Sequence, residues 1–157
     1  MKILMVCLGN ICRSPLAEGI MKHKLQQAGI DAHVDSAGLL NYHTGSMPDK
    51  RSVNTAGKHG IDITYQRARC ITKSDIHKFD YILAMDKSNF ENLLEYADKG
   101  EESRISLILD FAGLGKKEVP DPYYGNTGDF ENVYYLLDDA CQRIVDKLKI
   151  SSSLNLV

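Results

Sequence analysis

Four short apolar runs recur along the chain, and segments with helical spacing or helix-ending glycines lie between them. The first run stops directly before Gly9, as a buried strand does where the chain turns. A strand–helix–strand rhythm predicts a parallel sheet with helices on both faces. We therefore expect an α/β fold, a single three-layer domain with a four-stranded parallel sheet, and strands at residues 2–8, 31–38, 79–86 and 105–111.

Helix signals fill the intervals between these runs. Ser14 followed by Pro15 is typical of an N-cap and a first helical position, and Gly29 ends the same helix. The sequence TKSD, which begins at Thr72, matches a capping box with an acidic third residue. Further helices are predicted at residues 47–60, 87–100 and 129–150, and residues 151–157 form a tail that we expect to fray.

Composition limits the partners of the chain. The 157 residues carry a net charge of −2, which argues against general nucleic-acid binding. No apolar run approaches the length of a membrane span, and the first apolar stretch lacks a cleavage site, so we expect no membrane partner and no signal peptide. The five histidines show no metal-ligand spacing. We expect no metal and no cofactor.

Cysteine usage indicates a reduced, cytoplasmic protein with free thiols. Cys7, Cys12, Cys70 and Cys141 are spaced neither as a zinc ribbon nor as a dense disulfide scaffold.

The turn after the first strand, CLGNICRS, combines features of an anion site. Backbone N–H groups of such a turn and of the following helix start point inward. Gly9 permits a positive φ, and Asn10 tolerates one better than most residues. Arg13 adds a planar fork that can hold two oxygens of a tetrahedral oxyanion. The stretch therefore predicts a site for phosphate or a similar anion.

Cys7 lies at the base of this predicted site. The N–H groups that hold an oxyanion also favour a thiolate, which can attack phosphorus and form a phosphocysteine. Ser14 is placed to donate a hydrogen bond to the sulfur when it later leaves. The alternative is that Cys7 is a small buried hydrophobic residue. A nucleotide-binding Gly-Lys-Ser/Thr loop is disfavoured because no lysine follows the glycine.

A second candidate is the loop VPDPYYGN near the C-terminus. Asp121 stands between Pro120 and Pro122, which restrict its position, and its carboxyl group could protonate a leaving oxygen and then activate water. Tyr123 and Tyr124 could form an aromatic wall for a ring-bearing substrate. The alternative is a plain Pro-Asp-Pro turn with tyrosines against the core.

Five motifs occur in an order that resembles one known family over essentially the whole chain. They are VCLGNICRSP, DSAG at Ser36, KHGI at His59, FDYILAMD and DPYYGN. Together they are similar to the low-molecular-weight protein tyrosine phosphatase family. The resemblance implies that residues 1–150 form the phosphatase-like domain and that phosphotyrosine in proteins and small aryl phosphates are the substrates.

The resemblance also implies roles for individual residues. Cys7 would be the nucleophile, Arg13 the phosphate clamp and Asp121 the general acid and then base. The phosphate-binding loop would consist of Leu8, Gly9, Asn10, Ile11, Cys12, Arg13 and Ser14, with Asn10 held by hydrogen bonds involving Ser14, Ser36 and His59.

Two further implications concern oxidation and substrate shape. The resemblance implies that Cys12 can form a reversible disulfide with Cys7 that shields the nucleophile, and chance proximity of the two thiols is the alternative. Family members often carry an aromatic residue that lines the substrate cleft, between the DSAG motif and the next helix. In this chain Tyr42 is the candidate for that position, with Leu39 and Leu40 nearby.

The remaining expectations are a monomer or weak homodimer and inhibition by phosphate or other oxyanions. Tyrosines expected at the surface could serve a weak dimer or be phosphorylated themselves: Tyr123, Tyr124, Tyr134 and Tyr135. A thiol-linked arsenate reductase of the same fold is the main alternative, although Cys70 and Cys141 form no close pair. A phosphotyrosine-binding module without catalysis is the third.

Overall fold

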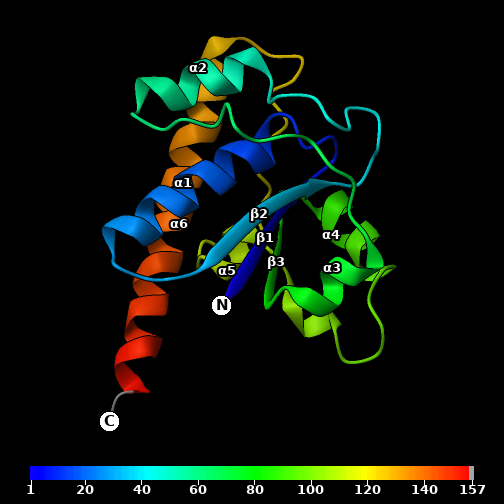
Figure 1. Ribbon diagram of the computed structural model, residues 1–157, viewed down its shortest axis with the longest axis vertical. Helices are drawn as coiled ribbons and strands as arrows, with labels where there is room; N and C mark the ends of the chain where they lie inside the picture. The colour runs from blue at the N-terminus through cyan, green and yellow to red at the C-terminus, as the bar shows by residue number, and fades with distance from the viewer. Residues whose placement is uncertain (156–157) are drawn as a thin grey trace.

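The computed structural model describes residues 1–155 and contains one parallel four-stranded sheet. The strands lie side by side in the order β2-β1-β3-β4, so β1 is central. Figure 1 shows β2, β1 and β3 next to one another in this order. Their bounds are β1 Lys2–Cys7, β2 His33–Gly38, β3 Tyr81–Ala84 and β4 Ile105–Leu107. The α/β architecture and the parallel sheet predicted from the sequence are confirmed.

Alternating side chains of β1 supply the cores on the two faces of the sheet. Ile3, Met5 and Cys7 belong to one buried cluster, whereas Leu4 and Val6 belong to the other. Both sets are buried because successive side chains of a strand point to opposite faces, and here both faces are covered.

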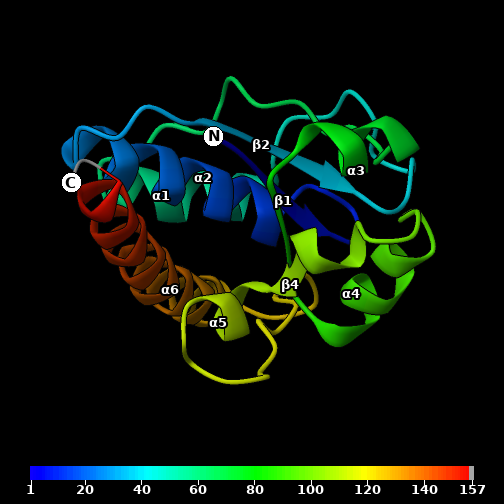
Figure 2. The same cartoon turned by 90° about the horizontal axis from the view of Figure 1, so that it is seen from below.

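Helices cover each face (Figure 2). The first cluster includes residues from α1, α2, α5 and α6, and the second includes residues from α3 and α4. The helices are α1 Arg13–Gln27, α2 Lys50–Lys58, α3 Lys73–Lys78, α4 Lys87–Leu94, α5 Ile108–Phe111 and α6 Thr127–Leu154, with a 3₁₀ turn η1 at Glu102–Arg104.

Two predicted helix starts have different outcomes. The capping box is confirmed, because Thr72 and Asp75 exchange hydrogen bonds at the start of α3. The assignment of Ser14 as an N-cap was wrong, since α1 begins at Arg13 with Cys12 as its N-cap. The Ser14 hydroxyl is instead bonded to the sulfur of Cys7 and to Asn10.

Three predicted element ends also differ. The fourth strand was predicted to run to Phe111, but it ends at Leu107 and the chain continues as α5. A continuous apolar run carries neither a period of two nor one of 3.6, so the sequence could not separate the two elements. Helix α4 ends at Leu94, before the predicted end at Gly100, and α6 continues through Leu154. Residues 156–157 of the predicted tail lie outside the described residues.

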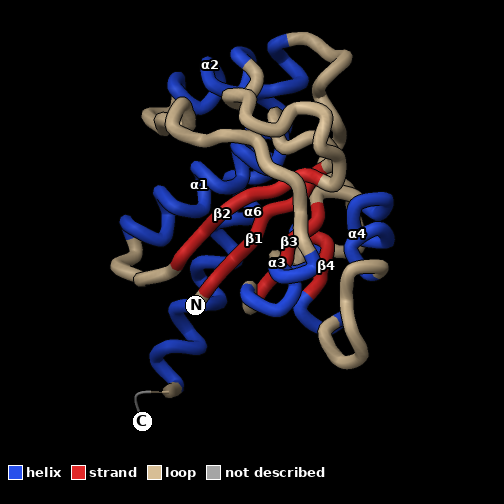
Figure 3. The backbone as a smooth tube through the Cα atoms, turned by 45° about the vertical axis from the view of Figure 1, so that its right-hand side comes forward, coloured by secondary structure: helices blue, strands red, loops and turns tan. Residues whose placement is uncertain are grey.

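The carboxyl ends of the strands meet at one edge of the sheet, and long loops gather there (Figure 3). Cys7 at the end of β1 is paired in register with Gly38 at the end of β2. Asp86 lies at the same edge, two residues after β3. In sheets of this kind ligands bind beyond the carboxyl ends of the strands.

Candidate active site

The backbone of residues 7–14, called here the 7–14 loop, turns its carbonyl oxygens outward. The Cys7 and Leu8 carbonyls accept hydrogen bonds from the N–H groups of Leu39 and Leu40, at 3.1 and 3.0 Å. The Ile11 carbonyl accepts from the Asp49 N–H at 2.8 Å. In a trans peptide the N–H points opposite to the C=O. The following N–H groups of the loop therefore point inward, as an anion site requires.

The sulfur of Cys7 lies within this loop and has two polar neighbours. The Asn10 N–H donates to Sγ at 3.3 Å, and Ser14 Oγ lies 3.0 Å from Sγ. Cys7 is buried, at the end of the apolar strand β1. The structure thus brings Cys7, Asn10 and Ser14 together, as expected from the sequence.

Asn10 has a φ of 56°, in the left-handed region that residues with side chains rarely adopt. Its Nδ2 donates to Ser14 Oγ at 2.8 Å and to Ser36 Oγ at 2.9 Å, and its Oδ1 accepts the Arg69 N–H at 3.0 Å. These three bonds fix a backbone conformation that would otherwise be costly.

His59 was predicted to take part in holding Asn10, and that prediction was wrong. Its Nε2 lies 3.0 Å from Glu131 on α6, and its ring stacks on Tyr134 with centroids 3.7 Å apart. The third partner of Asn10 is the backbone of Arg69. Tyr134, predicted at the surface, is 5% exposed because it packs beneath His59.

Arg13 is buried and is held by acceptors from two other segments. One guanidinium nitrogen donates to Asp86 Oδ2 at 2.7 Å and to the Val119 carbonyl at 3.0 Å. The other nitrogen lies 3.6 Å from Asp121 Oδ2. Asp86 is itself fixed, because it caps α4 by accepting the Asn89 N–H at 2.8 Å. The guanidinium is therefore oriented before any ligand arrives.

Asp121 lies at the rim of the site, with a side chain that is 49% exposed. Its Oδ1 accepts the N–H of Tyr123 at 3.1 Å, an Asx turn that leaves Oδ2 toward Arg13. The carboxyl group is thus placed between solvent and the guanidinium, where it can exchange protons with either a ligand or water.

A cavity of about 380 Å³ opens over the loop. Its floor and rim are lined by Cys7, Arg13 and Asp121. The three predicted wall residues also line it: Tyr42, Tyr123 and Tyr124. Leu40 and His43 complete the wall. An apolar, aromatic wall around a charged floor suits a phosphate group attached to a ring.

Gly38 permits the close approach between β2 and the loop. A Cβ at this position would lie 3.0 Å from the Gly9 carbonyl carbon and 3.0 Å from the Leu8 oxygen. Those distances are shorter than ordinary contacts, so steric crowding explains why the DSAG motif has a glycine at this position.

The two loop cysteines have different environments. Burial, followed by the charges of Asp49, Cys7 and Asp121, raises the pKa of Cys12 to about 12. Cys12 is therefore a thiol at neutral pH.

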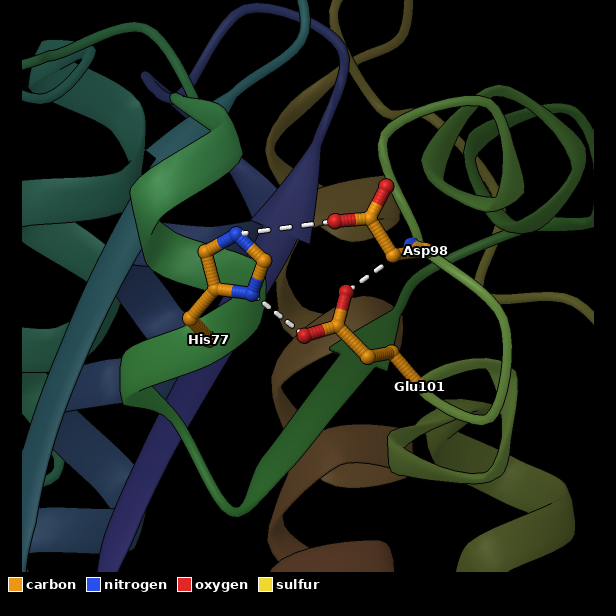
Figure 4. Close-up of side chains that lie close together, drawn as sticks. All are labelled: His77, Asp98 and Glu101. Atoms are coloured by element: carbon orange, nitrogen blue, oxygen red, sulfur yellow. Dashed lines mark hydrogen bonds and ion pairs between the residues drawn. The ribbon is translucent and has the colours of Figure 1, made fainter.

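A separate cluster lies away from the 7–14 loop and is shown in Figure 4. His77 at the end of α3 faces two carboxylates, with Nδ1 toward Glu101 and Nε2 3.9 Å from Asp98. Lys73 also pairs with Asp98, at 2.8 Å. In the described part of the chain, the three residues whose potential metal-ligand atoms lie within 4.8 Å of one another are His77, Asp98 and Glu101. Because these groups already pair among themselves, we interpret the cluster as an ion-pair network.

No helix in the described part of the chain is both long and apolar enough to cross a bilayer.

Reasoning from the sequence missed several supporting contacts. It did not find that Asp86, the last residue of the predicted third strand, pairs with Arg13. It also missed the Arg69 backbone and the buried carboxylate of Glu18, which accepts the Ser36 hydroxyl at 2.9 Å. An acid at the end of an apolar strand was a signal for Asp86, whereas Glu18 lay within an apparently ordinary helix.

The fold and this arrangement fit the class of phosphate-ester hydrolases: a thiol, an arginine and a carboxylate surround one anion-sized site at the carboxyl edge of a parallel sheet. Comparison with known proteins gives the family. The family described as low molecular weight phosphotyrosine protein phosphatase matches residues 2–153.

Three individual proteins illustrate the similarity. Low molecular weight phosphotyrosine protein phosphatase 1 of Drosophila melanogaster is 42% identical over 144 residues, which cover 89% of this chain and 92% of that protein. A protein tyrosine phosphatase structure from Entamoeba histolytica has a TM-score of 0.91 at 39% identity, with 97% and 99% covered. The structure of Vibrio vulnificus Wzb in complex with benzylphosphonate has a TM-score of 0.83 at 30% identity, with 93% and 97% covered.

The chain belongs to the low molecular weight phosphotyrosine protein phosphatase family, and it is a protein tyrosine phosphatase.

Proposed function

We propose that this phosphatase hydrolyses phosphotyrosine in proteins, and small aryl phosphates, through a phosphocysteine intermediate. The observation that carries the proposal is the position of the Cys7 sulfur within inward-pointing N–H groups, in the cavity that Arg13 and Asp121 also line, with Asp121 3.6 Å from the guanidinium. The benzylphosphonate bound by the Vibrio vulnificus relative is an aryl-containing phosphate analogue and supports this substrate class.

The first step transfers the phosphoryl group to sulfur. The phosphate oxygens bind the loop N–H groups and the Arg13 fork, which fixes phosphorus above Cys7. The S–P bond forms as the P–O bond to the ring breaks, and Asp121 gives its proton to the departing phenolate oxygen. The products are a phosphocysteine and a free phenol.

The second step returns the enzyme to its starting state. Asp121, now a carboxylate, takes a proton from a water molecule whose oxygen attacks phosphorus. The S–P bond breaks and inorganic phosphate is released. Ser14 Oγ, which lies 3.0 Å from Cys7 Sγ, donates a hydrogen bond to the departing thiolate.

The test uses p-nitrophenyl phosphate with rapid acid quench. Cys7→Ser should abolish turnover and the labelled adduct formed from a ³²P substrate, whereas the matched variant Cys70→Ser should keep both. Turnover by Cys7→Ser at the parental rate would refute the proposal.

The role of Asp121 has its own test. We expect Asp121→Asn to lower the rate for aryl phosphates by roughly 100-fold, the usual scale of lost acid–base help. Asp139→Asn, an exposed change on α6, is the control. Equal rates for both variants would remove Asp121 from the mechanism.

An arsenate reductase is not favoured. A relay of disulfides needs accessible thiols, but Cys141 is buried within α6, and burial raises its pKa to about 12. A reducing, cytoplasmic location fits the proposed chemistry because the sulfur of Cys7 must stay reduced in order to attack phosphorus. The monomer or weak homodimer stays a prediction, as does the protective Cys7–Cys12 disulfide.

A further inference from the structure

Glu18 is a buried carboxylate for which the reaction just described has no use. It lies on α1 and is 3% exposed. Its Oε1 accepts the Ser36 hydroxyl at 2.9 Å, and its Oε2 lies 3.0 Å from Lys22 Nζ and 3.3 Å from the Tyr65 hydroxyl. Burial raises the pKa of Glu18, and the bonds from Lys22 and Ser36 only partly offset this effect. A carboxylate kept in such a place needs a compensating role or partner.

A chain of hydrogen bonds connects Glu18 to the sulfur of Cys7. It passes from Glu18 to Ser36 at 2.9 Å, from Ser36 to Asn10 at 2.9 Å, from Asn10 to Ser14 at 2.8 Å and from Ser14 to Cys7 at 3.0 Å. Glu18, Ser36, Asn10, Ser14 and Cys7 are all buried, so these bonds are not in exchange with bulk water.

The direction of every proton in this chain follows from one fixed donor. The Arg69 N–H can only donate, so Asn10 must present Oδ1 to it and Nδ2 to the two serines. Ser14 and Ser36 each accept one N–H from Asn10 and keep one proton of their own. The Ser36 proton goes to Glu18, and the Ser14 proton is left for the sulfur.

We propose that Glu18 is a positioning residue that, through Ser36 and Asn10, directs the Ser14 hydroxyl proton to the Cys7 thiolate. This inference rests on the proposed function, because it assigns Glu18 to the support of that same thiolate. An ionised Glu18 can only accept, so Ser36 cannot turn its proton toward Asn10.

Removal of the carboxylate opens a competing arrangement. Without an acceptor at Glu18, the Ser36 proton has no buried partner, and an Asn10 amide rotated by 180° would accept from both serines. The Ser14 proton would then point to Asn10 and away from the sulfur. The rotated amide loses the hydrogen bond from the Arg69 N–H but gains one from Ser36. Because Glu18 competes for the same Ser36 proton, its presence determines which of the two arrangements is more stable.

The charge of Glu18 is balanced locally. Lys22 on the same helix is the cation that faces it, Tyr65 adds a hydroxyl, and Asp35 on β2 is the nearby group of like charge. Because Lys22 forms an ion pair with Glu18 at 3.0 Å, the influence on Cys7 runs mainly through the hydrogen-bond chain.

The experiment measures iodoacetate alkylation of Cys7 between pH 5 and pH 9 in the full chain, together with kcat and KM for p-nitrophenyl phosphate. In Glu18→Met the alkylation rate at pH 6, relative to its high-pH plateau, should fall by about 3- to 10-fold, the usual effect of one lost hydrogen bond. We expect kcat to fall by a similar factor and KM to change by less than about 2-fold. Glu18→Gln keeps a carbonyl acceptor and should be affected less.

A double-mutant cycle tests the path. Glu18→Met should add less than about 2-fold in the Ser36→Ala background, because that background has no Ser36 hydroxyl proton to turn toward Asn10. Glu131→Met is the matched control, because it removes another part-buried carboxylate outside the chain and should leave the alkylation profile unchanged. If Glu18→Met does not fold, Glu18→Gln takes its place in the cycle, with an expected change of about 2- to 3-fold.

Every result of these experiments either supports or overturns the positioning role of Glu18. A parental alkylation profile in the Glu18 variants, or effects of Glu18 and Ser36 that multiply, would overturn the positioning role. An unchanged Cys7→Ser turnover would instead refute the proposed function, so the two failures are distinguishable.

Discussion

Gly38→Ala is the smallest change that tests how the site is built, because it adds one methyl group to β2 and replaces no residue of the 7–14 loop. The new Cβ would lie 3.0 Å from the Gly9 carbonyl carbon, 3.0 Å from the Leu8 oxygen and 3.1 Å from the Asn10 Cβ. The backbone of Gly38 has no positive φ. Alanine is therefore allowed there, and the effect is purely steric.

The magnitude follows from these contacts. Ordinary contact begins near 3.4 Å, so the loop must move by about 0.4 Å, and its backbone atoms cannot rotate away as a side-chain end could. Overpacking of this kind costs about 2 kcal/mol of the free energy of unfolding. Displacement of the N–H groups and of Cys7 should also lower kcat/KM by about 10-fold, since a 1 Å error can cost 100-fold.

The assay combines urea denaturation with steady-state kinetics on p-nitrophenyl phosphate. Gly57→Ala on α2 is the matched control, because its Cβ would meet nothing within 4 Å. That variant should gain up to about 1 kcal/mol from helix propensity and keep its kcat/KM. If Gly38→Ala retained both parental stability and parental kcat/KM, the steric account of the DSAG glycine would be wrong.

Three other predictions test charges around the site and in the fold. Burial raises the pKa of Asp75, but the bonds from Arg69 outweigh this effect and hold that pKa below its usual 3.8. The ionised carboxylate therefore stabilises the fold above pH 3.8, and this contribution to the free energy of unfolding is lost as the pH falls through the folded-state pKa. Asp75→Asn should thus lower the free energy of unfolding by about 2 kcal/mol at pH 7, and by progressively less in acid, as measured by urea denaturation. Iodoacetamide at pH 7 should modify Cys7 and spare Cys12, whose pKa is about 12, and peptide mass spectrometry showing equal labelling would contradict this. Asp86→Asn should raise KM and the inhibition constant of phosphate by about 10-fold because the loop arginine loses its charged acceptor, and unchanged constants would argue against that contact.

Local signals were sufficient for much of the fold. The strands at residues 2–8 and 31–38, the capping box at Thr72 and the helix end at Gly29 were recognisable from neighbouring residues alone. Gly29 has a φ of 67°, which is the conformation that ends a helix and that glycine adopts without strain. Signals of this kind do not depend on the rest of the chain.

Contacts between distant segments were not predictable in the same way. The side chain of His59 meets Glu131 because α2 packs against α6, and the sequence gives no register for that contact. The backbone N–H of Arg69 carries no residue-specific signal, because every residue except proline has one. The pairing of Asp86 with Arg13 required the carboxyl ends of two strands to be placed beside each other.

The thiol site is therefore a property of the whole edge of the sheet and not of the CLGNICRS stretch alone. The N–H groups of the loop point inward because its carbonyls are held outward by Leu39, Leu40 and Asp49, which lie about 30 to 40 residues later in the chain. A Cys-x₅-Arg spacing without those donors would leave the peptide planes free to turn and their N–H groups free to bond elsewhere. This explains why the Cys-x₅-Arg spacing alone is weak evidence for a phosphatase.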